Sequence, residues 1–107
     1  MKKSKTYCFD IDGTICTTNC EYRNAKPFKE VINHINQLFN DGEIIIMFTS
    51  RGTNSGKDWY KFTRSQIDGW GVKYHKLLMG KPQADIFIDD RCANIDDWCK
   101  KNDLIKQ

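Results

Sequence analysis

The unbroken apolar run at residues 44–48 (IIIMF) constrains the fold more than any other feature of this chain. Five consecutive apolar residues are strand length, and a strand with no polar position is typical of the interior of a parallel sheet that is covered on both faces. The preceding residues 24–27 predict the start of a helix, and residues 40–42 predict its end. Between them the apolar residues recur at helical spacing: Phe28, Val31, Ile32, Ile35, Leu38 and Phe39.

Strand-like and helix-like segments alternate along the rest of the chain. We expect strands at residues 6–9, 72–79 and 84–88, a helix over residues 56–70, and a short closing helix. The residues expected to face inward from these two helices are Trp59, Phe62, Ile67 and Trp70, then Ile95, Trp98 and Cys99. The order β-α-β-α-β-β-α predicts an α/β fold, a Rossmann-like parallel sheet with right-handed crossovers and helices on both faces. At 107 residues, one domain spanning 1–107 is expected.

Composition excludes several classes of protein. The net charge of +3 comes without a dense basic stripe, which does not favour a nucleic-acid partner. No apolar stretch has membrane-spanning length, and no hydrophobic signal region follows the basic start, so no membrane partner is expected. The five cysteines are odd in number and lack C-x-x-C pairs, which predicts reduced thiols and a cytoplasmic protein.

Two carboxylates follow the first predicted strand, at Asp10 and Asp12, and Gly13 comes directly after them. The carboxyl ends of strands are where open α/β sheets place their ligands. Gly13 allows the chain to turn sharply beside the two acids. An ordinary acidic turn after a strand is the alternative, because D-x-D-G alone is a short motif.

Three later segments also follow predicted strands. Thr49, Ser50 and Arg51 come after residues 44–48, and Lys81 lies in the loop G-K-P at residues 80–82. The acidic pair Asp89 and Asp90 comes after residues 84–88. Because the carboxyl ends of parallel strands meet at one edge of a sheet, the four segments are expected to converge there. A second acidic pair at residues 96–97 falls in the first turn of a helix, where acids complement the dipole.

The four segments D-I-D-G-T, T-S-R-G, G-K-P and I-D-D-R resemble those of the haloacid dehalogenase superfamily, over residues 6 to 91. The sequences F-T-S-R-G and G-K-P-x-A-D-x-F-I-D-D-R are similar to those of small phosphatases of capsule and surface-polysaccharide biosynthesis. The resemblance implies an enzyme, a phosphatase that works through an aspartyl-phosphate. It implies that Asp10 is the nucleophile, Asp12 the general acid/base, Thr49 the phosphate-binding hydroxyl and Lys81 the catalytic lysine.

A phosphate ester is anionic, so a carboxylate nucleophile needs a cation to offset the repulsion. Magnesium suits this role, since it takes one or two carboxylates, a phosphate oxygen and waters. We expect Mg²⁺ as the cofactor, held by Asp10, by the backbone carbonyl of Asp12 and by Asp89. Asp90 is expected to support the site from behind.

Several assignments stay open at the level of sequence. Ser50, rather than Thr49, is a second candidate for the phosphate-binding hydroxyl, and Lys76 competes with Lys81 for the lysine. Ser50 and Arg51 are expected to bind substrate phosphate, although an arginine of this kind equally well pairs with a carboxylate. Residues 52–58 have the wrong spacing for a phosphate-binding loop, and residues 10–13 lack the later ligands of a calcium loop.

The chain has little room for a cap over the site, since residues 15–26 make only a short flap. An open pocket fits either a large substrate or a small one enclosed by a homo-oligomer. The surface-polysaccharide resemblance favours a small phosphorylated sugar or polyol, with Tyr22, Arg23 and Arg51 as specificity residues. The alternatives are a macromolecular substrate (a nucleic-acid end or a phosphoprotein), a non-catalytic module that binds magnesium and a phosphorylated ligand, and a receiver-type phosphoacceptor.

Overall fold

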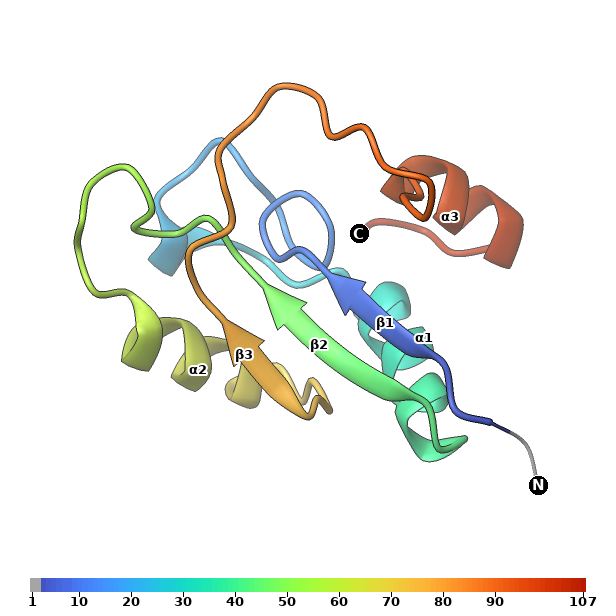
Figure 1. Ribbon diagram of the computed structural model, residues 1–107. Coiled ribbons are helices and arrows are strands. Elements are labelled where there is room, and N and C mark those ends of the chain that lie inside the picture. The colour runs from blue at the N-terminus through green and yellow to red at the C-terminus, as the bar shows by residue number, and fades with distance from the viewer. Residues whose placement is uncertain (1–2) are drawn as a thin grey trace.

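The computed structural model describes residues 3–107 and contains a three-stranded parallel sheet flanked by helices (Figure 1). The strands are β1 (Thr6–Phe9), β2 (Ile44–Phe48) and β3 (Lys76–Leu78), in the order β1-β2-β3. The helices are α1 (Lys29–Asn40), α2 (Tyr60–Gly69) and α3 (Ile95–Asn102), with a short 3₁₀ turn, η1 (Tyr22–Asn24). The predicted α/β fold with a parallel sheet is confirmed.

The hydrophobic core lies between the sheet and α1. The predicted stripe supplies Val31, Ile32 and Ile35, which are buried, and the strands supply Ile45 and Met47 from the same face of β2. Spacings of three and four residues place the α1 side chains on one side of the helix, and alternation does the same along β2. After α1, Gly42 adopts a φ of +91°, which lets the chain reverse into β2 as a residue with a side chain would not.

The opposite face of β2 is not covered as the apolar run predicted. Ile44 is 39% exposed and Leu78 of the neighbouring β3 is 44% exposed, while Ile45 between β1 and β3 is fully buried. Two successive right-handed crossovers that add strands in the same direction place both connecting helices on one face of the sheet. Trp98 of α3 packs on the same inner face, with its ring 6.1 Å from that of Phe9. Within residues 3–107, the described helices therefore cover one face.

The prediction of a fourth strand at residues 84–88 is wrong. This segment has no regular structure, and Ile86 and Ile88 are 75% and 95% exposed. A strand exists only through hydrogen bonds to a neighbouring strand, and the segment pairs with none of β1, β2 or β3. Figure 1 shows it as a long loop that arches from β3 towards α3. β1 and β3 are therefore the two edge strands of the described sheet.

The second helix begins later than predicted, at Tyr60 instead of residue 56. The Asp58 side chain accepts a hydrogen bond from the Tyr60 backbone N–H (3.0 Å) at its start. Of the apolar residues expected to face inward, Ile67 is buried, whereas Phe62 is exposed and the neighbouring Thr63 is fully buried instead. No helix within residues 3–107 combines the length and the apolar character needed to cross a membrane.

Candidate functional site

A tight loop after β1 carries both acids of the D-x-D-G motif. The backbone N–H groups of Thr14 and Ile15 donate to the Ile11 carbonyl at 3.0 and 2.9 Å. Ile11 itself is fully buried, so the side chain between the two acids is anchored in the core. Asp10 and Asp12 are both partly exposed. The anchored Ile11 thus leaves its two neighbours available at the carboxyl end of β1.

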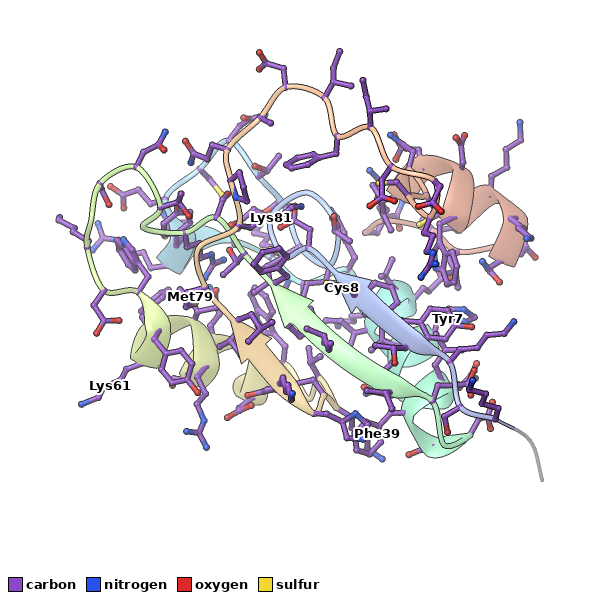
Figure 2. The ribbon with its side chains drawn as sticks, in the orientation of Figure 1. Tyr7, Cys8, Phe39, Lys61, Met79 and Lys81 are labelled. Atoms are coloured by element: carbon purple, nitrogen blue, oxygen red, sulfur yellow. The ribbon has the colours of Figure 1, made fainter. Side chains whose placement is uncertain are left out.

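Lys81 forms an ion pair with Asp10, although most of the chain separates the two residues in sequence. The Nζ atom of Lys81 lies 3.5 Å from Oδ2 of Asp10, and its backbone N–H donates to the Thr49 carbonyl at 3.0 Å. The ammonium group also lies 4.6 Å from the ring centre of Phe87. In Figure 2, Lys81 lies beyond the carboxyl ends of β1 and β2. The competing Lys76 is exposed at the beginning of β3, the opposite end of that strand.

The electrostatic environment of Asp10 is mixed. Burial raises the pKa of the Asp10 carboxyl above its usual value, and the nearby Asp12 acts in the same direction. The backbone N–H of Ile11 and the Lys81 ammonium oppose this effect. Asp10 is therefore a partly desolvated carboxyl with one cation beside it.

Thr49 and Ser50 follow β2 at the same edge of the sheet. Thr49 is buried, and its Oγ1 accepts a hydrogen bond from the Arg51 backbone N–H at 3.1 Å. Its own N–H donates to the Leu78 carbonyl at 3.0 Å, which ties the end of β2 to β3. Ser50 is only partly buried. Both hydroxyls remain candidates for binding a phosphoryl oxygen.

Arg51 has a different position from the one expected of a substrate-binding residue. Its side chain is 0% exposed, and the guanidinium binds both carboxylate oxygens of Asp12, Nε to Oδ2 at 2.9 Å and Nη2 to Oδ1 at 2.8 Å. Its Nη1 donates to Gln66 Oε1 at 2.7 Å and to Thr63 Oγ1 at 3.2 Å. This geometry agrees with the alternative that Arg51 pairs with a carboxylate. The expected direct contact of Arg51 with substrate does not fit it.

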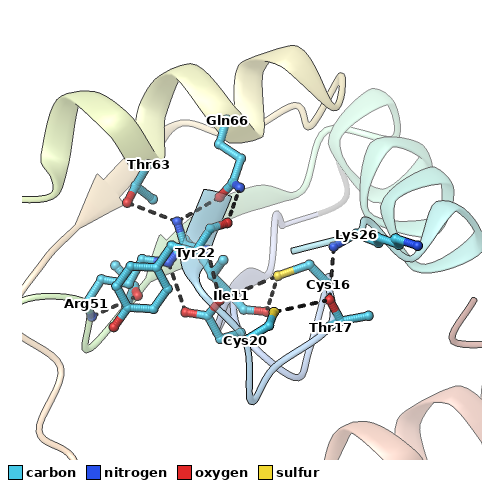
Figure 3. Close-up of polar contacts among 11 residues, drawn as sticks. Ile11, Cys16, Thr17, Cys20, Tyr22, Lys26, Arg51, Thr63 and Gln66 are labelled. Atoms are coloured by element: carbon cyan, nitrogen blue, oxygen red, sulfur yellow. Dashed lines mark hydrogen bonds and ion pairs between the residues drawn. The ribbon is translucent and has the colours of Figure 1, made fainter. Parts of the chain in front are cut away.

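The flap at residues 15–26 is attached to this ion pair. The ring of Tyr22 lies 4.5 Å from Cζ of Arg51, and the Tyr22 carbonyl accepts a hydrogen bond from Gln66 Nε2 at 2.6 Å. Arg23, the other proposed specificity residue of the flap, is exposed and pairs with Glu21. Figure 3 shows Tyr22 beside Arg51 and below α2.

Sequence reasoning did not find Thr63, Gln66 or Cys16 as members of the site. Thr63 and Gln66 are three residues apart, the spacing of one helix face, and this was the only available signal. The Cys16 thiol is 3.6 Å from Asp12 Oδ1 and 3.6 Å from the Ile11 carbonyl. Burial raises the pKa of Cys16 to about 12, so it stays a protonated donor.

Asp89 and Asp90 are not brought to the other acids. Both lie on the exposed loop after residue 88, where Asp89 accepts a hydrogen bond from the Arg91 backbone N–H (3.0 Å) and Asp90 lies 3.6 Å from the Arg91 guanidinium. Within residues 3–107 no three metal-binding side chains form a cluster. The Asp10 carboxylate and the Asp12 backbone carbonyl are the oxygen donors present, and oxygen donors suit magnesium.

Two depressions lie near this edge of the sheet and along β3. The smaller, of about 190 Å³, is next to Arg51 and is lined by Gly52, Trp59, Met79 and their neighbours. A Cβ atom at Gly52, which has a φ of +82°, would lie 2.2 Å from the Lys57 carbonyl oxygen, so this wall requires glycine. The larger, of about 620 Å³, follows β3 and the exposed side of α2, and neither Asp10 nor Asp12 lines it.

Comparison with known proteins supports the fold. No protein-family model and no curated protein matches the chain. The structure is similar to the crystal structure of a structural-genomics target from Vibrio cholerae, with a TM-score of 0.80 and 25% sequence identity. The match covers 88% of this chain and 86% of that chain. It supports a small α/β domain and carries no information about an activity.

Proposed function

We propose that this protein is a magnesium-dependent phosphomonoester hydrolase that forms an aspartyl-phosphate on Asp10. The observation that supports it most is the meeting of Asp10 and Lys81 at 3.5 Å, with Thr49 joined to Lys81 through the backbone. A carboxylate, a lysine and a hydroxyl at the carboxyl ends of parallel strands are the groups that phosphoryl transfer uses.

In the proposed reaction an Asp10 oxygen attacks phosphorus as the bond to the leaving oxygen breaks. Asp12 enters this step as the protonated carboxylic acid and gives its proton to the departing alkoxide. The resulting carboxylate then removes a proton from the water that attacks the aspartyl-phosphate and frees inorganic phosphate. Lys81 and the Thr49 or Ser50 hydroxyl stabilise charge on the phosphoryl oxygens. Asp10 and the Asp12 backbone carbonyl would hold Mg²⁺, which when bound offsets the repulsion between carboxylate and phosphate.

The substrate class follows from the resemblance and from the short flap. We propose that the substrate is a small phosphorylated sugar or polyol of surface-polysaccharide biosynthesis. We also propose a cytoplasmic location, because all five cysteines are free and thiols stay reduced in that compartment. The flap contains a single 3₁₀ turn, so it does not form a cap domain. Neighbouring copies in a homo-oligomer would supply further walls for a small substrate.

Phosphate release from an aryl phosphate and from a panel of sugar and polyol phosphates tests the proposal. We expect release with magnesium and none after chelation, with turnover of at least one sugar or polyol phosphate. Turnover of nucleic-acid ends or phosphoprotein alone would favour the macromolecular alternative. No release from folded, magnesium-bound protein would favour a binding module, and stable phosphorylation by a small phosphodonor without turnover would favour a receiver.

The role of Asp89 needs a test of its own, because in this structure Asp89 is exposed and, within residues 3–107, belongs to no cluster of metal-binding side chains. We keep Asp89 as the third proposed magnesium ligand, which requires the loop that carries it to move. Asp89→Asn is then expected to raise the magnesium concentration for half-maximal activity by about tenfold or more, since a ligand carboxylate is lost. Asp97→Asn, an exposed acid in the first turn of α3, is the control and should leave that concentration unchanged. Equal behaviour of the two variants would remove Asp89 from the ligand set.

A further inference from the structure

We propose that Arg51 is a positioning residue that fixes the Asp12 carboxyl group for proton transfer, and that α2 in turn fixes Arg51. The inference deepens the proposed function and rests on it. In this inference Arg51 acts on Asp12, the acid/base residue, and does not contact the substrate phosphate.

The contact between the two side chains is bidentate. Two N–H groups of one guanidinium face two oxygens of one carboxylate, at 2.9 and 2.8 Å. Such a fork fixes the plane and the direction of the carboxylate, which a single ion pair does not. The side chain of Asp12 is 22% exposed while that of Arg51 is 0% exposed, so the acid faces the open site and the arginine lies behind it.

Arg51 itself is held from three other directions. Gln66 and Thr63 of α2 accept hydrogen bonds from Nη1, and the backbone N–H of Arg51 donates to Thr49 Oγ1. The Tyr22 ring lies against Cζ at 4.5 Å. Because α2 and the flap contact the guanidinium and Thr49 fixes the backbone of Arg51, the guanidinium has little freedom to rotate. The orientation of Asp12 is therefore set by elements other than its own loop.

The proposed chemistry predicts a specific effect when this support is lost. A general acid must lie within about 3 Å of the atom that it protonates, and a misplacement of about 1 Å costs on the order of 100-fold in rate. The first step needs Asp12 only when the leaving group is a strong base, as an alkoxide is. Nitrophenolate leaves without a proton, so its release in the first turnover does not need Asp12.

A purely structural role for Arg51 would have a different signature. The buried pair connects the loop after β1 to the segment after β2 over 39 residues of sequence, and its loss would also loosen the fold. Loosening of the whole site lowers the rate for every substrate by the same factor. The comparison of two leaving groups therefore separates positioning from general stability.

The experiment compares wild type, Arg51→Lys and Gln66→Met in saturating magnesium, with 4-nitrophenyl phosphate and glycerol phosphate as substrates. Lysine keeps the charge but lacks the fork, and methionine removes the amide that accepts from Nη1 while keeping similar volume. We expect the first-turnover rate of Arg51→Lys to fall about 100-fold on glycerol phosphate and to stay close to wild type on 4-nitrophenyl phosphate. Steady-state turnover of both should fall because Asp12 also activates the water, and aspartyl-phosphate should accumulate with 4-nitrophenyl phosphate, whose first step stays fast. Gln66→Met should show the same pattern more weakly.

Arg64→Lys is the matched control, since Arg64 lies on α2, is exposed and has its Nε atom 3.9 Å from an Asp68 carboxylate oxygen. It should leave both first-turnover rates unchanged. An equal fall on both substrates in Arg51→Lys and Gln66→Met, or no fall in either, would overturn the positioning role. If wild type itself forms neither free phosphate nor aspartyl-phosphate, the proposed function fails and the inference fails with it. Should Arg51→Lys not fold, Gln66→Met decides the question by the same criterion.

Discussion

Asp10→Asn is expected to lower magnesium-dependent phosphate release by at least about a thousandfold, because loss of a nucleophile removes the covalent route altogether. Asparagine has nearly the shape of aspartate, so the loop after β1 and the buried Ile11 should be undisturbed. The amide lacks the negative charge with which Asp10 attracts Lys81 at 3.5 Å and attacks phosphorus. The measurement is steady-state phosphate release, together with the mass of the acid-quenched protein to detect an aspartyl-phosphate.

Asp12→Asn distinguishes the role of Asp12 from that of Asp10. This variant keeps the nucleophile but lacks the group that activates water, so it should form an aspartyl-phosphate that persists. Asp10→Asn should form none. If Asp10→Asn turned over the aryl phosphate at a rate near that of wild type, Asp10 would not be the nucleophile and the proposed mechanism would be wrong.

Ile45→Ala is expected to destabilise the fold by about 2–5 kcal/mol, the range for removing a large aliphatic side chain from a packed core. Ile45 is fully buried in the central strand, where it belongs to the core that α1 covers. Domains of this size are typically stable by only about 5–15 kcal/mol, so the variant should unfold at a much lower denaturant concentration. Equilibrium unfolding in urea, followed by circular dichroism, gives the free energy of unfolding.

Ile44→Ala is the control for that measurement. It makes the same chemical change one position earlier in the same strand, and it removes nearly the same strand propensity. Ile44 points to the other face of the sheet and is 39% exposed, so its loss should cost clearly less than that of Ile45. Equal costs at the two positions would mean that the second face of β2 is covered in solution.

Local periodicity explains which elements were predictable. The α1 stripe and the strands at β1 and β2 lie where they were predicted, because each pattern is a property of neighbouring residues. Residues 84–88 have equally strong strand character and are an exposed loop. Strand character describes a segment, whereas a strand also needs a partner, and no local signal says which edge accepts it.

In the candidate site, too, some features follow from local sequence and others only from the fold. The positions of Asp10, Asp12, Thr49 and Lys81 after predicted strands placed them at one edge of the sheet, and the resemblance supplied their proposed roles. The choice of Lys81 over Lys76 as the neighbour of Asp10 depends on which end of β3 each lysine occupies. The contact between Lys81 and Asp10 itself is seen only in the folded chain.

Arg51 shows most clearly what the amino-acid sequence leaves undecided. Its place after β2 and its charge follow from the sequence, and both suit a phosphate ligand and a carboxylate partner equally. Tertiary structure decides between them, because α2 and the flap bury the guanidinium and bring Asp12 to within hydrogen-bonding distance from 39 residues away. Burying an arginine without a carboxylate partner would be costly, so the packing that buries Arg51 also dictates its partner. Strand ends and chemical types are local properties, whereas burial and pairing arise only when distant segments pack together.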